Sequence, residues 1–452
     1  MLTQEARSYH SIRIDSVHYC DREIELAAKR KRRSHSGRNG SAPQERLQLL
    51  SRTVRENGQL AQKVEYLKIP YMVREGSLTD LARTISFMPN LRYVDLPDAL
   101  YTDDPSCGML KQELQARCPG LCQMRYLHGS ESSFQTLAQS RRWRNLEALE
   151  LSHLAVEPTT IIDVFTALTA LREVKMADMP MLDDSLFDST TPGISFPPLA
   201  IFSLQATPNI SATGLVTYLS QPLARKTLNH LLLTDTGVLA SDLHRILSTA
   251  SNLTSLDITM SVTRPLSLSQ LPPLASPSLR TFHYEISSAT LSPGGLASPS
   301  DSYYAYLSTS VLSGSLPSLS HLYVLSDSPQ TLLQPAPCPP HKGSRTGARP
   351  SPLSLGITRP LHLYTKSVRE MEWDVTLISP PSSAHRRGSI TAAEPESLRH
   401  HPPLSPLYRN KDRDSVIVGN GFGGFLAVPT LDSAPGSPQW KNKKKDMDAW
   451  MG

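Results

Sequence analysis

The stretch that decides the fold is RNLEALELSHL, residues 144–154. Here Leu146, Leu149 and Leu151 follow the order leucine, two other residues, leucine, one other residue, leucine. Read alone, this spacing suits half an amphipathic helix or a short alternating strand. A single copy does not distinguish a helix from a strand. Copies that recur at a fixed interval do, because a repeated unit determines the architecture of the whole chain.

The same apolar spacing occurs ten times along the chain. Eight strong copies begin at Val64, Leu91, Leu121, Leu146, Leu171, Leu199, Leu228 and Leu253, and two weaker copies begin at Leu279 and Leu319. Successive starting positions are 25 to 30 residues apart, except for an interval of 40 residues before the last. This period is typical of leucine-rich repeats, in which each unit contributes one strand and one helix.

The segments between the copies have the apolar spacing of helices. The stretches concerned are residues 77–90, 157–170 and 240–252. Pro158 stands where a first helical turn tolerates proline, and Ser241 is expected to cap its helix. Stacked units share one continuous core that no unit could form alone. We therefore predict an α/β leucine-rich-repeat solenoid, a horseshoe with parallel strands on its concave face, helices outside and disordered flanks.

The proline distribution divides the chain. Of 37 prolines, 13 precede residue 260 and the other 24 lie between Pro265 and Pro438. Segments rich in proline and serine bury too little apolar surface to fold. The expected organisation is an N-terminal strand and basic loop (1–42), a leucine-rich-repeat domain (43–329), a disordered insertion (330–360), C-terminal capping strands (361–379) and a mostly disordered tail (380–452).

The N-terminal segments SYHSIRID (8–15) and ERLQLLSRTVRENGQLAQKVEYLKI (45–69) resemble the start of the repeat domain in fungal F-box/leucine-rich-repeat proteins. The resemblance covers roughly residues 8–330. It implies a substrate receptor of a ubiquitin ligase, in which an F-box docks on the adaptor of a cullin–RING complex. The sequence has no leucine–proline–x–glutamate motif of that element. The adaptor is therefore expected as a partner only if an F-box is encoded upstream of Met1.

The candidate partner-binding residues are the non-leucine positions of the early strands. Side chains alternate along a strand, so these positions should point away from the core on the concave face. Tyrosine mixed with both charges suits a protein-binding surface, although an ordinary solvated sheet face would have the same pattern. The residues selected are Tyr66, Lys68, Tyr93, Asp95, Arg125, Glu150 and Lys175. Later strands place Ile201, His230, Leu232, Asp257, His283, His321 and Tyr323 on the same face.

One motif suggests nucleotide chemistry. In VIVGNGFGGF (416–425), Gly419, Gly421 and Gly424 match the glycine spacing of dinucleotide sites. Such a site needs a helix after the glycines, whereas a proline-rich segment follows here. We therefore expect a docking strand or partner-binding segment.

Other enzyme signatures are missing from the sequence, including the phosphate-binding loop, the G-x-S-x-G elbow and the H-E-x-x-H zinc motif. Cys118, Cys122 and His128 fit no standard zinc spacing. The sequence thus favours a non-enzymatic protein without a cofactor.

The basic run Lys29, Arg30, Lys31, Arg32 and Arg33 suits either a nuclear-import signal or a solvated loop. Ser34 and Ser389 follow paired arginines and are candidate phosphosites. No stretch approaches the roughly 18 apolar residues of a membrane span, and the net charge is only +5. We expect a protein of the cytoplasm, the nucleus or both, without a membrane partner.

The function expected is recognition of a protein partner on the concave face, with a scaffold that has no ubiquitin role as the alternative. Binding of nucleic acid is disfavoured, because the basic runs lie off the repeats and lack interleaved aromatic residues.

Overall fold

A computed structural model describes most of the repeat region. The described residues are 10–14, 42–69, 75–139, 143–188, 195–268, 271–288, 298–325, 359–367, 372–379, 417–420 and 424–427. The chain divides into two compact units, Met1–His385 and Arg386–Gly452. The basic run 29–33, Ser34, Ser389, nearly all of the predicted insertion and most of the predicted tail lie outside the described residues.

The first unit begins with a three-stranded sheet covered by helices. Strands β1 (Ser11–Arg13), β2 (Tyr66–Lys68) and β3 (Tyr93–Asp95) pair in parallel in chain order. Helices α3 (Ala42–Glu56), α4 (Gly58–Ala61) and α5 (Glu75–Ile85) lie between them in the chain. Leu47 of α3 and Leu81 of α5 are fully buried, so these helices cover the start of the core.

A ten-stranded sheet continues the stack. Its strands in chain order are β4 (Gln123–Leu127), β5 (Ala148–Ser152), β6 (Glu173–Ala177), β7 (Ile201–Gln205), β8 (His230–Thr234), β9 (Ser255–Val262), β10 (Thr281–Ser288), β11 (His321–Leu325), β12 (Leu361–Lys366) and β13 (Asp374–Ile378). Strands β4 to β12 are all parallel to their neighbours, and β13 closes the sheet in the antiparallel direction. A backbone hydrogen bond from Cys122 N to Arg92 O connects this sheet to the strand segment of β3.

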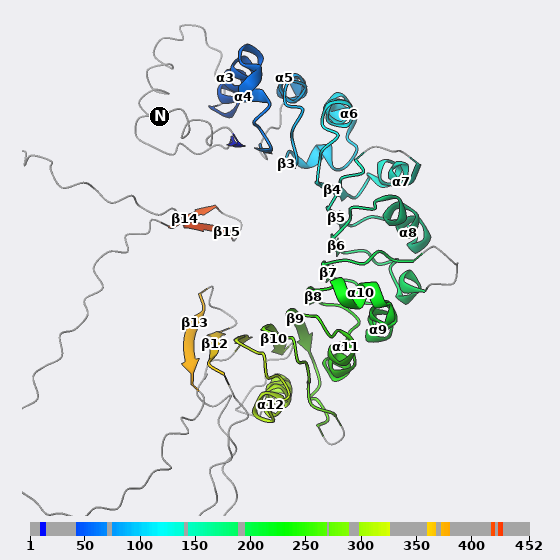
Figure 1. Ribbon diagram of the computed structural model, residues 1–452, viewed down its shortest axis with the longest axis vertical. Helices are drawn as coiled ribbons and strands as arrows, with labels where there is room; N and C mark the ends of the chain where they lie inside the picture. Colours follow the sequence, from blue (N-terminus) through cyan, green and yellow to red (C-terminus); the bar gives the residue numbers. More distant parts are fainter. Residues whose placement is uncertain are drawn as a thin grey trace, which may run out of the picture. The chain divides into compact units, whose positions relative to one another are not determined.

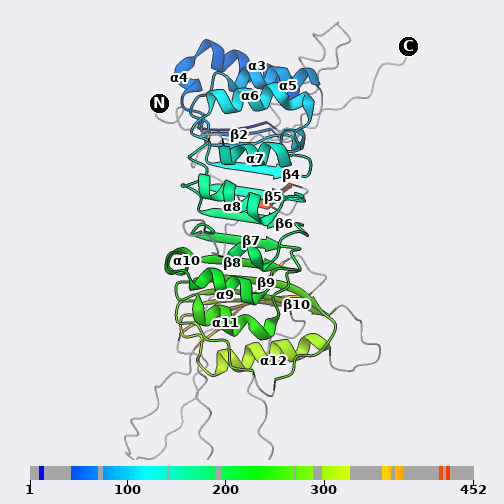
Figure 2. The same cartoon turned by 90° about the vertical axis from the view of Figure 1, so that its right-hand side faces the viewer.

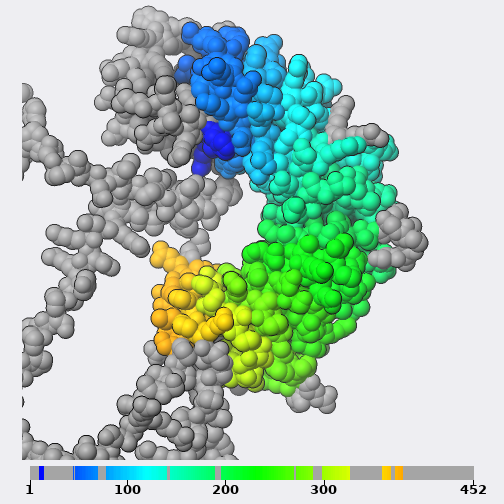
Figure 3. All heavy atoms as spheres, in the orientation of Figure 1, coloured from blue at the N-terminus to red at the C-terminus, as the bar shows by residue number. Residues whose placement is uncertain are grey.

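Helices lie on the outer side of this curved stack and strands on its inner, concave side (Figures 1 and 2). The connecting helices are α6 (Gly108–Arg117), α7 (Glu131–Gln139), α8 (Pro158–Ala167), α9 (Ala212–Ser220), α10 (Pro222–Thr227), α11 (Leu243–Thr249) and α12 (Pro299–Leu312), with 3-10 turns η1 (Asp98–Leu100), η2 (Pro105–Cys107), η3 (Asp184–Phe187) and η4 (Ala240–Asp242). The mixed α/β composition, the long parallel sheet and a leucine-rich-repeat-like solenoid are thereby confirmed. The space-filling view follows the same curvature (Figure 3).

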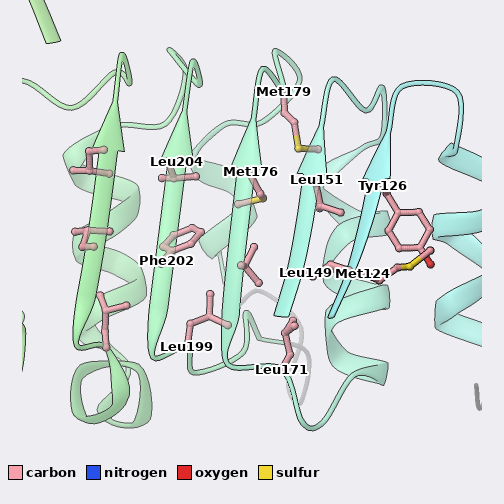
Figure 4. Packing of buried hydrophobic residues seen from close by; sticks show 14 of the residues in the cluster. Met124, Tyr126, Leu149, Leu151, Leu171, Met176, Met179, Leu199, Phe202 and Leu204 are labelled. Carbon is pink, nitrogen blue, oxygen red and sulfur yellow. The ribbon is translucent and has the colours of Figure 1, made fainter. Parts of the chain in front are cut away.

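Every apolar residue of the ten predicted copies is buried. Leu146, Leu149 and Leu151 of the opening stretch are at most 2% exposed, and Leu149 and Leu151 lie on strand β5. Equivalent residues of adjacent strands form a continuous layer between sheet and helices (Figure 4). The opening stretch is therefore a strand and not a helix. The expected cap at Ser241 is wrong, since Ser241 lies inside η4 and α11 begins after Asp242 without a side-chain cap.

A left-handed backbone residue ends four consecutive strands. His153, Asp178, Ala206 and Asp235 follow β5 to β8 directly and have φ between 49° and 56°. Each donates its backbone N–H to a carbonyl of the next strand, with N···O distances of 2.9 to 3.0 Å. The acceptor is the last residue of β6, β7 and β8, and Thr259 within the longer β9. The corner thus repeats with the strand and fixes where each chain segment leaves the sheet. Aspartate tolerates this conformation, whereas alanine does so at a cost.

The two segments expected to cap the solenoid differ in role. Strand β12 pairs in parallel with β11, and its Leu361 and Leu363 are buried like the repeat leucines. It therefore belongs to the repeat sheet. Only β13 runs antiparallel, and its Val375 and Leu377 are each 56% exposed.

The described part of the second unit is a hairpin. Strands β14 (Ile417–Asn420) and β15 (Gly424–Ala427) pair antiparallel around the glycine motif. A strand thus follows the glycines where a dinucleotide site would have a helix.

Candidate protein-binding surface

One line of side chains crosses the concave face in register. Strand pairing places these residues opposite one another from β2 to β12, with a break only between β3 and β4. We call this line the central row. It consists of Lys68, Asp95, Arg125, Glu150, Lys175, Ser203, Leu232, Asp257, His283, Tyr323 and Tyr364.

The first five members of the central row form a ladder of alternating charge. Lys68 pairs with Asp95. The Arg125 guanidinium lies 3.6 Å from Asp95 Oδ1 and 2.9 Å from Glu150 Oε2, and Lys175 Nζ lies 2.9 Å from Glu150 Oε1. The Arg125–Asp95 pair bridges the break between the two sheets. The structure therefore brings together all five charged residues selected from the sequence.

The two selected tyrosines lie beside this ladder. Tyr66 and Tyr93 are register partners on β2 and β3, two residues before Lys68 and Asp95. Both are half-buried, and they alternate with buried Leu67 and Val94, which places them on the ladder's side of the sheet. Their phenol groups and the paired charges thus belong to one surface.

At the other end of the central row, its members His283, Tyr323 and Tyr364 form an aromatic cluster with Trp373, which directly precedes β13. The rings of His283 and Tyr323 stack with centroids 3.7 Å apart, and those of Tyr323 and Tyr364 stack at 4.1 Å. Trp373 meets Tyr323 edge-on at 5.2 Å. The alternation rule puts His283 and Tyr323 on this face but does not select them. It misses Tyr364 and Trp373, because the long segment between β11 and β12 interrupts the regular spacing by which the repeats are recognised in the sequence.

The side chain of Lys366, the last residue of β12, packs within this cluster. Lys366 Nζ lies 4.2 Å from the Trp373 ring centroid and 3.2 Å from Glu285 Oε2. Both charged groups are largely shielded, with side chains 21% exposed. This end of the concave face therefore holds a cation between an aromatic ring and a carboxylate.

Asp257 is the exception among the carboxylates of the central row. It is half-buried, its Oδ1 has no hydrogen-bond donor, and no lysine or arginine of the described residues pairs with it. Burial raises the pKa of Asp257, and the nearby imidazoles of His283 and His230 and the Ser255 hydroxyl partly oppose that rise. Burial also lowers the pKa of His283, which keeps this imidazole neutral near pH 7.

Two shallow hollows lie away from the central row. One, of about 480 Å³, is lined by Asp103, Cys107, Lys111 and Ser133 among others, and its Lys111 and Asp103 pair with each other. The second, of about 550 Å³, lies among residues that precede the strands, including Arg92, Cys122 and Glu147. Arg92 and Glu147 lie 3.7 Å apart across it. Each hollow thus contains one cation and one carboxylate that already pair with each other.

The cysteines singled out in the sequence are buried. Burial raises the pKa of the Cys118 thiol to about 12, and Cys118 Sγ lies 3.6 Å from the Met88 carbonyl oxygen. Cys122 Sγ lies 3.3 Å from Arg92 Nε. Within the described ranges, no group of three His, Cys, Asp or Glu side chains could hold a metal ion. No helix in these ranges is long and apolar enough to cross a membrane.

Comparison with known proteins gives partial similarities only. Neither a protein-family model nor a curated protein sequence matches the chain. A structure of TLR13 in complex with ssRNA13 is 12% identical over 60% of this chain and 48% of its own, with a TM-score of 0.27. The Toll–Spatzle complex of Drosophila is 14% identical over 62% of this chain and 44% of its own, with a TM-score of 0.24. The chain spans about half the length of these structures. The fold assignment therefore rests on the repeats and the sheet described above.

Proposed function

We propose that the protein is a non-enzymatic recognition module that binds a polypeptide partner on its concave sheet face. The observation that carries this proposal is the central row, which presents an ordered charge ladder and an aromatic cluster on one surface. Tyrosine, tryptophan and arginine are the residues that most often dominate binding energy at protein interfaces. Side chains held by a rigid sheet also lose little further freedom when a partner binds.

The two ends of the surface contribute in different ways. Charges of the ladder already satisfy one another, so a partner gains modest affinity there but must match the order of signs. The aromatic cluster offers large, rigid rings whose contact area costs little entropy. The proposal thus assigns selectivity mainly to the ladder and affinity mainly to the cluster.

The finer proposal is that the partner is a substrate for ubiquitination. It is supported by the resemblance of residues 8–15 and 45–69 to F-box/leucine-rich-repeat proteins, and this region contributes β1, α3, α4 and β2 to the solenoid. In that arrangement the F-box binds the adaptor and the repeats bind the substrate. A scaffold without a ubiquitin role would use the same concave face.

Substitution of the concave tyrosines tests the general proposal. The tagged chain would be incubated with cell extract, and retained proteins would be quantified by mass spectrometry for wild type and for Tyr66→Ala/Tyr93→Ala. A matched control is Met109→Ala/Leu223→Ala, which removes exposed apolar side chains from helices α6 and α10 on the outer side. We expect the tyrosine pair to lose specific partners that the control retains. Loss in the control alone would place binding on the helices.

A separate experiment addresses the ubiquitin role. Purified cullin–RING adaptor would be mixed with the chain and the mixture analysed by size-exclusion chromatography. Co-elution would support the substrate-receptor proposal and would show a docking element in this chain. Its absence would agree with the missing leucine–proline–x–glutamate motif and is expected both for the scaffold and for a receptor whose F-box lies outside this sequence. Either result leaves binding on the concave face to be decided by the tyrosine variants.

A further inference from the structure

We infer that Asp257 is a docking point for an arginine side chain of the bound polypeptide, which would lie against the His283 ring. This inference rests on the proposed function and specifies the chemistry of the partner. It concerns the segment of the central row between Leu232 and His283, where the charge ladder has ended and the aromatic cluster begins.

The pattern of charge pairing points to this position. Asp95 and Glu150 in the central row each contact two cations, and Glu285, two residues after His283, contacts Lys366. Asp257 alone among these four carboxylates has no cationic partner within the described residues, and its Oδ1 accepts no hydrogen bond. Since leaving a half-buried carboxylate unpaired costs stability, a cation from outside the chain would complete the pattern.

The groups around Lys366, which come from β10, β12 and the residue before β13, show the same chemistry with its cation present. There Lys366 lies between the Glu285 carboxylate and the Trp373 ring. Asp257 and His283 repeat the combination of a carboxylate and a ring, since the two residues are register partners on β9 and β10. His283 stacks on Tyr323 with one face of its ring. The combination at Asp257 therefore has the acceptor and the ring but lacks the cation.

An arginine fits these groups better than a lysine. Its planar guanidinium can stack on a neutral imidazole while it donates a hydrogen bond to the carboxylate, whereas an ammonium group offers only a point charge. Oδ1 of Asp257 is itself buried, so the guanidinium is expected at the other carboxylate oxygen. Leu232, the register partner of Asp257 on β8, would contact the methylene groups of the arginine stem. The partner expected is thus a segment with an arginine that reaches the concave face near β9.

A peptide selection provides the test. A random dodecapeptide library displayed on phage would be selected against the immobilised full chain, and the enriched peptides would be synthesised with a fluorescent label. Affinities would be measured by fluorescence anisotropy for wild type, Asp257→Asn and Asp257→Glu. The matched control is Asp163→Asn, which makes the same change at an exposed position of helix α8.

We expect enriched peptides to contain arginine and to bind Asp257→Asn at least about tenfold more weakly than wild type, as loss of a charge-assisted hydrogen bond predicts. Asp257→Glu should retain part of the affinity, and Asp163→Asn all of it. Peptides that bind Asp257→Asn as tightly as wild type, yet respond to Tyr66→Ala/Tyr93→Ala, would overturn the inference and leave the proposed function intact. Failure to enrich any peptide that depends on the concave face would count against both.

Discussion

Arg125 Nε lies 2.9 Å from Glu150 Oε2, and the two residues are register partners on β4 and β5. The same guanidinium reaches Asp95 across the break between the two sheets. Arg125 therefore links strands that the backbone pairs least well, and it does so from a position that is 37% exposed.

Arg125→Ala should lower the free energy of unfolding by about 1 kcal/mol, because it removes two partly screened ion pairs whose carboxylates keep their lysines. Salt screens such pairs, so the loss should shrink in 1 M salt. Urea denaturation at low and high salt measures both effects. An equal loss at both salt concentrations would mean that the arginine stem, and not its charge, stabilises the sheet.

Leu149→Asp should destabilise the solenoid by roughly 3–5 kcal/mol, because it buries an unpaired carboxylate among the repeat leucines. Ala148→Asp is the matched control, since Ala148 precedes Leu149 on β5 and faces the concave side half-exposed. Thermal unfolding followed by circular dichroism should show a large fall for Leu149→Asp and a small one for the control. Similar melting of the two variants would contradict the register assigned to β5.

Ala206→Asn should stabilise the protein by about 0.5–1 kcal/mol. Ala206 has φ of 49°, at a corner where the repeats on either side use Asp178 and Asp235. An alanine in the left-handed region costs about 1 kcal/mol, and asparagine tolerates that region better. Urea denaturation of the variant and of Ala148→Asn, a change to the same residue outside the corner, measures the gain. If both variants were more stable than wild type, the gain in stability would not come from the left-handed conformation at residue 206.

The buried tyrosines should make the solenoid sensitive to alkali. Burial raises the pKa of Tyr101 to about 12, from an ordinary value near 10. Because the folded pKa is the higher one, the contribution of Tyr101 is complete below about pH 10 and is lost as the pH rises toward 12.

Tyr101→Phe should therefore lose less stability than wild type between about pH 9 and about pH 11, by roughly 1 kcal/mol. At neutral pH the variant should be less stable by about 1 kcal/mol, since the Tyr101 hydroxyl accepts from Leu96 N and donates to Val94 O. Urea denaturation of the variant and of wild type at neutral pH, about pH 9 and about pH 11 measures the loss at neutral pH and the smaller loss in alkali. Parallel pH profiles would show that Tyr101 ionises as readily as an exposed tyrosine.

Asp257 should destabilise the free protein when it is ionised. Its folded pKa is raised by burial, so its contribution to stability is complete below the ordinary aspartate pKa and falls as the pH rises through the folded value. Asp257→Asn should therefore melt at the same temperature as wild type, or higher, at about pH 7.5. A lower melting temperature would make Asp257 a structural residue.

The affinity for an arginine peptide should fall at low pH, whereas the contribution of Asp257 to the stability of the free protein rises there. Binding should weaken as the pH falls toward about 5, because Asp257, whose pKa is raised by burial, takes up a proton and loses the charge that pairs with the guanidinium. Burial raises the pKa of the neighbouring Tyr323, so its phenol stays neutral throughout. Fluorescence anisotropy at about pH 7.5 and about pH 5 measures the affinity, and the affinity should change less for Asp257→Asn than for wild type.

The sequence by itself determined the repeating unit. The interval between copies of the leucine spacing and the alternation within each copy are local properties, and they placed Leu149 in the core and Lys68, Asp95, Arg125, Glu150 and Lys175 on one face. Local signals failed where a competing turn was available, as at Ser241, where η4 begins before the helix.

Only the tertiary structure decided which side chains meet across strands. Pairing register depends on how neighbouring repeats stack, so the ladder around Arg125 and the stack of His283, Tyr323 and Tyr364 cannot be read from any one repeat. The long segment after β11 also separates Tyr364 from its partners in the sequence but not in space. For the same reason Asp257 is recognisable only in the folded sheet, where each neighbouring carboxylate has a cation and Asp257 has none.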